Sequence, residues 1–298
     1  MRTVAIGVDV DDTFTTFVQQ SLAAGAEPLC INLRVAVSGA WRFDLPADAP
    51  ARLLYDGQQI ELAPDDAYYC RLIDLSAGTP PEVARRWQGL LTGMRAWLDA
   101  VPGKVANRPS GGLHNSSKPL HETVLRGLGW RVPESITTSD GEALRAFARN
   151  GPTISKTVCG VRADTVMVTE TDLEHFDPAS GPVHLQRCVP GDDVRIHVVG
   201  DRVVAQRADA DAVDYRRGGG LSRMRVFEPP EDVRHRLVET TPALGLAFAG
   251  WDFKIDEAGD YWCLEANPMP GYAPYDDHCD GAISRALRQY LDPGSSSS

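Results

Sequence analysis

A predicted hairpin near the end of the chain constrains the fold more than any other segment. Its strands are residues 251–255 and 262–268, and the connection between them is centred on Ala258 and Gly259. Alternating apolar positions on both sides of a glycine-containing turn are typical of an antiparallel pair. We expect one face of this pair to pack on a core. The residues predicted for that face are Phe253, Ile255, Trp262 and Leu264.

The other face of the hairpin predicts a metal site. Pairing about the turn sets Asp252 opposite Glu265, and the period of two puts Asn267 on the same face. Hard oxygen ligands without His or Cys suit Mg²⁺ better than Zn²⁺, and sparsely held Mg²⁺ usually shares its coordination with phosphates. The pattern therefore indicates nucleotide-triphosphate chemistry. An ordinary acidic hairpin is the alternative for the Asp and Glu pair taken alone.

Composition excludes several classes of protein. The chain has 298 residues and a net charge of −11, which argues against nucleic acid as the main partner. It has no apolar run of bilayer length, and a strand begins at Thr3 without room for a signal peptide, so we expect a cytoplasmic protein that does not enter a membrane. The cysteines are far apart, without a C-x-x-C pair, and are expected to be reduced thiols. They are Cys30, Cys70, Cys159, Cys188, Cys263 and Cys279.

The periodicity of the first hundred residues predicts a doubly wound α/β domain. Strands are expected at 3–8, 28–32, 52–55 and 67–72, and helices at 14–24 and 80–100. Residues 102–117 are rich in Gly, Pro, Asn and Ser, which indicates a linker. We therefore predict an N-terminal domain at 1–105.

Two mixed α+β lobes and a tail are expected after the linker. The predicted central lobe, 106–185, has helices at 118–128 and 141–149 and a strand at 152–156. The predicted C-terminal lobe, 186–292, contains the hairpin and helices at 231–246 and 281–291. Residues 293–298 are expected to form a flexible tail. The fold class is thus α/β and α+β in three lobes.

The order of motifs in the second half resembles the ATP-grasp superfamily. A lysine before a helix, V-P, a lysine at a strand end, a glutamine strand, G-D-D-V-R and D-F…L-E-A-N-P follow one another between about Asn107 and Leu291. The most specific parts are residues 185–200 and 252–270. The resemblance implies a three-lobed ATP-grasp fold and a carboxylate-amine ligase that uses ATP and Mg²⁺ through an acyl phosphate. The loop at 160–165 would belong to its lid.

The resemblance also implies roles for particular residues. The ATP phosphates would be held by Lys118, Lys156 and Arg195, and the adenine by Gln186, Arg187 and the backbone of Cys188. Asp193 would face the ribose. Asp252, Glu265 and Asn267 would be the magnesium ligands. Lysine is a compact point charge suited to phosphate, and arginine makes bidentate forks, so these residue types agree with the roles.

A further segment is similar to the ligases that cyclise ribosomal peptides, the graspetide type. Asp214-Tyr215-Arg216 matches their D-x-R element. The match implies that Arg216 faces the acyl phosphate as a catalytic residue, with Arg207 close by. A charged loop edge is the alternative.

The end of the predicted site departs from those peptide cyclases. After Pro268 the chain continues Met-Pro-Gly-Tyr-Ala-Pro-Tyr-Asp-Asp, which looks more like free-standing RimK-like or dipeptide ligases. Tyr275, Asp276 and Asp277 would then bind an amino-acid or peptide substrate, the two carboxylates holding its ammonium. Helix capping before Gly281 is the alternative. We expect amide bond formation in a peptide natural-product pathway, with a graspetide-type maturase as the second hypothesis, and we leave a homodimer open.

A rival motif lies at the end of the first strand. Asp9-Val10-Asp11-Asp12-Thr13 resembles the nucleophile signature of haloacid dehalogenase-type phosphatases, in which Asp9 would attack phosphate and Asp11 would assist. That hypothesis leaves the hairpin and both lysines unexplained, and acidic residues after a first strand are also ordinary helix caps.

Overall fold

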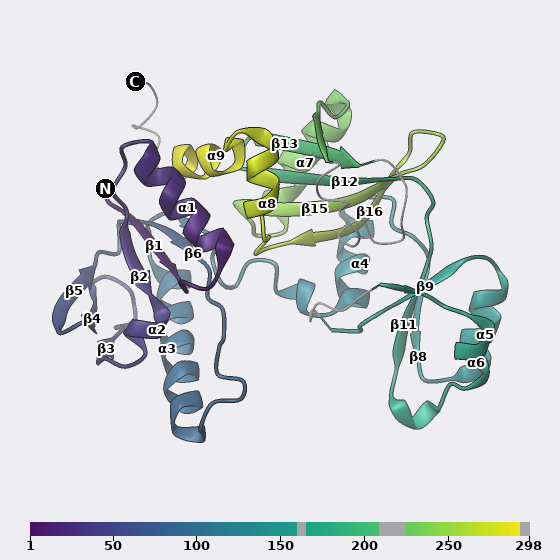
Figure 1. The fold of residues 1–298 in the computed structure, drawn as a ribbon, viewed down its shortest axis with the longest axis horizontal. Helices are drawn as coiled ribbons and strands as arrows, with labels where there is room; N and C mark the ends of the chain where they lie inside the picture. Colours follow the sequence, from purple (N-terminus) through teal and green to yellow (C-terminus); the bar gives the residue numbers. More distant parts are fainter. Residues whose placement is uncertain (160–164, 209–223, 293–298) are drawn as a thin grey trace.

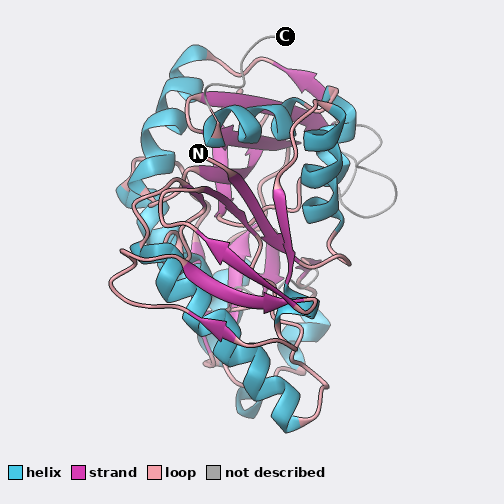
Figure 2. Ribbon diagram, turned by 90° about the vertical axis from the view of Figure 1, so that its left-hand side faces the viewer, coloured by secondary structure: helices cyan, strands magenta, loops and turns pink. Residues whose placement is uncertain are grey.

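The computed structural model describes residues 1–159, 165–208 and 224–292, which form three lobes (Figure 1). The N-terminal lobe is an α/β unit, and the two lobes that follow are a small and a large α+β unit. Seen from the side, strands run through the middle of the molecule and helices lie along both sides (Figure 2). This is the predicted order of lobes.

The N-terminal lobe is built on a parallel sheet of order β2-β1-β6-β7. Alternate residues of β1 face opposite sides, so Val4 and Ile6 pack in the core under α3 and Ala5 packs with α1. Helices on both faces make this sheet doubly wound, as predicted. Its elements are β1 (Thr3–Gly7), α1 (Asp12–Ala23), β2 (Leu29–Asn32), α2 (Leu33–Ala36), β6 (Ala67–Cys70), α3 (Pro81–Ala100) and β7 (Val105–Ala106).

A separate three-stranded sheet of order β3-β4-β5 covers one end of this lobe. β4 (Ala51–Tyr55) and β5 (Gln58–Leu62) are joined by Asp56 and Gly57, which have φ of 49° and 75°. Asp-Gly with positive φ at both positions suits the tight hairpin turn that matches strand twist. β3 is Trp41–Arg42.

The small lobe contains an antiparallel sheet of order β10-β9-β11-β8 with two helices beside it. The carboxylate of Asp140 accepts hydrogen bonds from the amides of Glu142 and Ala143, so this residue begins α5 as predicted. The elements are β8 (Ser135–Thr138), α5 (Gly141–Arg149), β9 (Thr153–Lys156), β10 (Val166–Met167), α6 (Glu170–Glu174) and β11 (Val183–Arg187).

The large lobe contains the hairpin within an antiparallel sheet of order β14-β13-β12-β15-β16. Its core gathers Trp251, Phe253 and Ile255 from β15 with Leu125 and Trp130 from the α4 segment. The elements are α4 (Lys118–Gly127), β12 (Asp192–Val199), β13 (Arg202–Ala208), β14 (Arg225–Phe227), α7 (Glu231–Ala243), β15 (Phe248–Ile255), β16 (Tyr261–Asn267), α8 (Ala273–Asp276) and α9 (Ala282–Leu291).

A third apolar cluster joins the N-terminal and large lobes. Phe14 and Phe17 of α1 pack with Ile283 and Leu287 of α9, and α1 and α9 lie side by side in Figure 1. Phe248 at the start of β15 belongs to the same cluster. The N-terminus of α1 is thereby fixed against the large lobe.

The lobes differ from the predicted boundaries at two points. β11 continues to Arg187, so a boundary after residue 185 would cut a paired strand. α4 was predicted in the central lobe, but Leu125 is buried in the core of the large lobe. Within the described ranges, no helix has both the length and the apolar character needed to cross a bilayer.

Candidate active site

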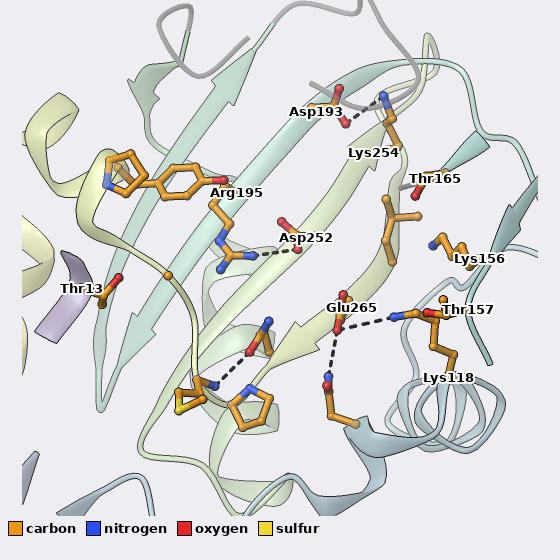
Figure 3. A pocket seen from close by; sticks show the side chains of 18 of the residues that line it. Thr13, Lys118, Lys156, Thr157, Thr165, Asp193, Arg195, Asp252, Lys254 and Glu265 are labelled. Atoms are coloured by element: carbon orange, nitrogen blue, oxygen red, sulfur yellow. Dashed lines mark hydrogen bonds and ion pairs between the residues drawn. The ribbon is translucent and has the colours of Figure 1, made fainter. Parts of the chain in front are cut away.

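A cavity of about 830 Å³ opens where the three lobes meet. The strands β12, β15 and β16 form its floor, the small lobe forms one wall, and the N-terminus of α1 lies at the opposite end (Figure 3). A cavity of this size has room for a nucleotide and part of a second molecule. Most of the residues predicted for ATP and metal lie along it.

The hairpin sets the predicted metal ligands side by side. Asp252 of β15 pairs with Glu265 of β16 as predicted, and Asn267 also lines the cavity. A β-bulge lies next to this pair, because Phe253 is opposite Cys263 and Leu264 is the extra residue.

Because of the bulge, the residues of the hairpin that face the core differ from those that we predicted. Leu264 and Glu265 both line the cavity, and the core position is taken by Cys263. Trp262 lies opposite Lys254, not in the core, and its indole N–H donates to Asp256 at 2.8 Å. The prediction was therefore wrong for Leu264 and Trp262 and right for Phe253 and Ile255.

Both carboxylates of the predicted metal site have charged neighbours. Arg195 lies opposite Asp252 in the sheet, and its Nη1 donates to Asp252 Oδ2 at 2.7 Å. Asn115 Nδ2 donates to Glu265 Oε1 at 3.1 Å, and Lys118 Nζ lies 3.9 Å from the same oxygen (Figure 3). Burial by itself raises the pKa of Glu265, but the Lys118 charge and the Asn115 hydrogen bond outweigh it and lower the pKa below its usual value.

A histidine of α4 fixes the backbone between the last two predicted ligands. His121 Nε2 accepts a hydrogen bond from the amide of Ala266 at 2.9 Å, and its Nδ1 lies 2.7 Å from Nδ1 of His114. Burial lowers the pKa of His121 to about 4, so the ring is neutral and can accept this bond. The helix thereby holds the strand that carries Glu265 and Asn267.

The two predicted phosphate lysines face the cavity from different elements. Lys118 is the first residue of α4, and Lys156 is the last residue of β9. Lys156 Nζ donates to Gln186 Oε1 at 2.7 Å. Burial and the nearby Lys118 charge lower the pKa of Lys156.

A buried carboxylate, Glu122, supports Gln186 and was missed by the sequence analysis. It is 3% exposed and accepts hydrogen bonds from Gln186 Nε2 at 2.6 Å and His184 Nε2 at 3.0 Å. The hydroxyl of Ser135 donates to its other oxygen. Because the carboxylate only accepts, the Gln186 amide is oriented with its oxygen toward Lys156.

The adenine-binding prediction places residues at the small-lobe wall. Gln186, Arg187 and Cys188 all line the cavity. The guanidinium of Arg187, however, donates to the carbonyls of Gly151 at 2.8 Å and Phe147 at 3.1 Å within the small lobe. Its side chain thus stabilises that lobe.

Asp193, the residue predicted at the ribose, has a partner that we did not predict. Its Oδ1 lies 2.9 Å from Nζ of Lys254, and both line the cavity (Figure 3). Lys254 is two residues after Asp252 on β15, so strand alternation alone places it on the same face. That signal was available in the sequence.

Arg207 lies on the wrong face of the sheet for a catalytic role. It pairs with Val194, a core residue, and its Nη2 lies 2.5 Å from Asp192 Oδ2. Its neighbour Gln206 takes the inner face and donates to the Tyr275 carbonyl at 2.7 Å. The period of two therefore excludes Arg207 from the cavity. Arg216 and the rest of its D-x-R element lie outside the described residues, as does most of the predicted lid.

The predicted substrate residues divide into one in the cavity and two outside it. Tyr275 lines the cavity, with the Arg195 guanidinium 5.4 Å from its ring centre. Asp276 is 1% exposed and accepts from the amides of Ile283 at 2.8 Å and Ser284 at 3.1 Å. Asp277 is exposed and is not among the lining residues. Asp276 thus satisfies amides in the first turn of α9, and the prediction that Asp276 and Asp277 hold a substrate ammonium was wrong.

The structure also contradicts the phosphatase hypothesis. Asp11 accepts from the Thr13 amide as the N-cap of α1 and forms a buried ion pair with Arg71. Asp9 forms an exposed ion pair with Arg34 at 3.0 Å and does not line the cavity. A nucleophile needs a free carboxylate facing the substrate, and neither residue provides one.

Comparison with solved structures identifies the fold. The ATP-grasp ligase PsnB, solved with a phosphomimetic variant of its minimal precursor, Mg and ADP, is 26% identical with a TM-score of 0.80 over 97% of this chain and 98% of that one. The chain has the fold of the ATP-grasp ligases. This confirms the predicted three-lobed ATP-grasp fold. The macrocyclase MdnC of Microcystis aeruginosa, bound to precursor peptide MdnA, has a TM-score of 0.82 at 18% identity over 99% and 100% of the two chains, a likeness of fold alone.

Curated relatives match this ATP-grasp chain over shorter segments. A probable alpha-L-glutamate ligase of Photobacterium profundum is 29% identical over 140 residues, which are 44% of this chain and 45% of the relative. One of Xanthomonas campestris is 37% identical over 107 residues, 34% and 35% of the two chains. Human beta-citrylglutamate synthase B is 23% identical over 210 residues, 65% and 54%. The matched segments thus span at most a little over half of the length of these relatives. No family model matches it.

The donor set of this ATP-grasp chain fits magnesium. Asp252, Glu265 and Asn267 present carboxylate and amide oxygens to one cavity, which are ligand types that Mg²⁺ prefers. With only two carboxylates, an ion bound there would complete its coordination with water or phosphate oxygens. Lys118 and Lys156 line the same cavity and have the charge to pair with such phosphates.

Proposed function

We propose that this chain is an ATP- and Mg²⁺-dependent carboxylate-amine ligase that acts on a peptide. One observation carries the proposal: the hairpin oxygens of Asp252, Glu265 and Asn267 share a cavity with Lys118 and Lys156 in an ATP-grasp fold. The complexes of PsnB with ADP and Mg, and with a precursor peptide and AMPPNP, support the same ligands here.

The proposed reaction has two steps. An oxygen of the substrate carboxylate attacks the γ-phosphorus of ATP, ADP leaves, and an acyl phosphate forms. The substrate amine then attacks the acyl carbon, the bond from this carbon to the bridging oxygen breaks, phosphate leaves with that oxygen, and the amine gives up one proton. The protein contributes positioning and charge: the lysines and Arg195 would bind phosphate oxygens, and Mg²⁺ neutralises charge that develops on them.

Adenine and the second substrate would take opposite ends of the cavity. Gln186 and the backbone of Cys188 line the small-lobe end, where the base would lie. Thr13, Arg71 and Tyr275 line the end toward the N-terminal lobe. We assign that end to the peptide.

Two candidate substrate classes follow from different observations. Similarity over 97% of the chain to a ligase complexed with its precursor favours a ribosomally made peptide, joined through its own side chains by amide or ester links. The match to probable alpha-L-glutamate ligases favours free amino acids as the second candidate, but it covers less than half of the chain. The maturase is therefore the first candidate.

The test is release of ADP and inorganic phosphate from ATP and Mg²⁺. Single amino acids, amino-acid pairs and leader-bearing peptides would be compared, with product mass measured for each. Release with a peptide, together with loss of one water from its mass per bond, is expected. Release with amino-acid pairs alone would favour the second candidate. ATP turnover that is the same with a chelator as with Mg²⁺ would contradict the proposal.

A matched pair of variants tests the metal assignment. Glu265→Gln removes one charge from the predicted ligand set and should lower turnover by about 100-fold or more. Glu257→Gln makes the same chemical change in the exposed turn of the same hairpin and should leave turnover near the wild-type value. Equal rates for the two variants would remove Glu265 from the metal site.

A further inference from the structure

His197 lies on the cavity face of the sheet, next to Arg195, in a place where an apolar side chain would fit. It is 0% exposed on β12, two residues after Arg195. The rings of Tyr275, Phe248 and Tyr272 surround it at centroid distances of 5.2, 6.2 and 6.4 Å. Burying a polar ring among aromatic side chains is unfavourable unless it makes a hydrogen bond. The buried imidazole of His197 therefore requires a hydrogen-bond partner.

The partner of this imidazole is Arg195. Arg195 Nε donates to His197 Nε2 at 3.3 Å. A guanidinium has no acceptor, so Nε2 must be the unprotonated nitrogen and Nδ1 must carry the proton. Nδ1 has no hydrogen-bond partner among the described residues. The ring thus places an acceptor beside Arg195, while its Nδ1 proton is buried without a partner in the described part of the chain.

The ring is neutral, as this bond requires. Burial, with the Arg195 charge beside it, lowers the pKa of His197 well below its ordinary value. A neutral acceptor fixes the direction of the guanidinium without cancelling its charge. A carboxylate at the same place would neutralise it.

The other contacts of the guanidinium show what this anchor adds. Nη1 donates to Asp252 Oδ2 at 2.7 Å, and a Cβ at Gly250 would lie 2.2 Å from Nη2, so the glycine leaves the space that the guanidinium occupies. Asp252 is also a proposed magnesium ligand. When its oxygens bind a cation, the bond to Arg195 weakens, and His197 remains as a contact that does not depend on the metal.

We propose that His197 is a positioning residue that holds the Arg195 guanidinium toward the nucleotide phosphates while Asp252 binds the metal. This inference rests on the proposed function, because it takes ATP and Mg²⁺ as the ligands. It assigns to His197 no contact with substrate.

The test is calorimetric binding of AMPPNP with Mg²⁺, and separately of adenosine, to wild type and variants. His197→Phe fits the aromatic surroundings but removes the acceptor. We expect about tenfold weaker AMPPNP binding, unchanged adenosine binding, and a melting temperature equal to or above that of the wild type. His197→Gln can place an oxygen near the Nε2 position and should retain most of the affinity for AMPPNP.

A second pair and a control guard against a misfolded variant. His197→Met is close to glutamine in length but offers no oxygen, so it should bind AMPPNP about tenfold more weakly than His197→Gln. Phe248→Leu disturbs the same aromatic cluster without removing a polar atom, and should lower the melting temperature with little change in AMPPNP affinity.

The binding and melting data can contradict the proposed role of His197 in three ways. Wild-type AMPPNP affinity in folded His197→Phe or His197→Met would overturn the inference. Equal losses for AMPPNP and adenosine, or a tenfold loss in Phe248→Leu, would assign the effect to packing and overturn it as well. If the wild-type protein itself bound no AMPPNP, the proposed function would fail first, and this inference with it.

Discussion

Replacement of Glu122 should destabilise the small lobe by an amount that the buried cluster sets. Glu122→Ala leaves the N–H groups of Gln186 and His184 without their acceptor. Each unsatisfied buried donor costs about 1–3 kcal/mol, so we expect the free energy of unfolding to fall by about 2–6 kcal/mol. Glu122→Gln keeps the shape and one oxygen, and should cost about 1–3 kcal/mol.

The pH dependence of the Glu122→Gln effect follows from the carboxyl pKa. Burial by itself raises this pKa, but hydrogen bonds from His184 and Ser135 outweigh it, so the pKa is lower in the folded protein than its ordinary value of 4.5. A carboxyl of this kind stabilises fully above its unfolded pKa and loses that contribution as pH falls through the folded pKa. The difference between wild type and Glu122→Gln should therefore be full at neutral pH and shrink below about pH 4.5.

Urea unfolding at a series of pH values, followed by far-UV circular dichroism, measures this difference. Hydrogen exchange of the β8 and β11 amides would show whether the loss is local to the small lobe. Glu142→Gln, an exposed change in the first turn of α5, is the control and should have little effect. Equal stability of Glu122→Gln and wild type at neutral pH, or a difference that grows on acidification, would refute the reasoning.

Three further predictions test the placement of single residues. Arg207→Ala should leave ATP turnover within about twofold of wild type, because the side chain is on the far face of the sheet; a loss of 100-fold would return Arg207 to catalysis. Asp276→Ala should lower the melting temperature through the lost acceptor at the N-terminus of α9 while AMPPNP affinity stays the same, and unchanged melting would contradict the capping role. Burial and the Lys118 charge lower the pKa of Lys156, so AMPPNP affinity should fall with rising pH earlier than for an ordinary lysine, and Lys156→Arg should flatten that profile. A profile that is the same in both would refute this assignment.

Local periodicity was enough to predict most elements and the central pairing of the site. The expected helix at 141–149 has the bounds of α5, and Asp252 lies opposite Glu265 as the turn predicts. The bulge could not be predicted, since an extra residue in Cys-Leu-Glu-Ala leaves the apolar pattern readable in two ways. Leu264 changed sides for that reason.

Residues that depend on pairing between distant segments were harder to predict. The side of Arg207 is set by its partner Val194, and the D-x-R similarity alone did not include that information. Glu122 meets His184 and Gln186 across 62 and 64 residues of sequence, and no local pattern marks such a cluster. The strand alternation that we used for Asp252 would also have placed Lys254 on the cavity face.

The turn of the hairpin is a practical attachment point for a label. The pairs from Phe253 to Ile255 separate it from the β-bulge and from the site residues Asp252 and Glu265. Glu257 is exposed there, whereas Gly259 has a φ of 84° and would be strained by any side chain. With the exposed Cys159 and the cavity residue Cys188 replaced, a Glu257→Cys variant could carry a fluorescent label that would report on the large lobe during ligand binding.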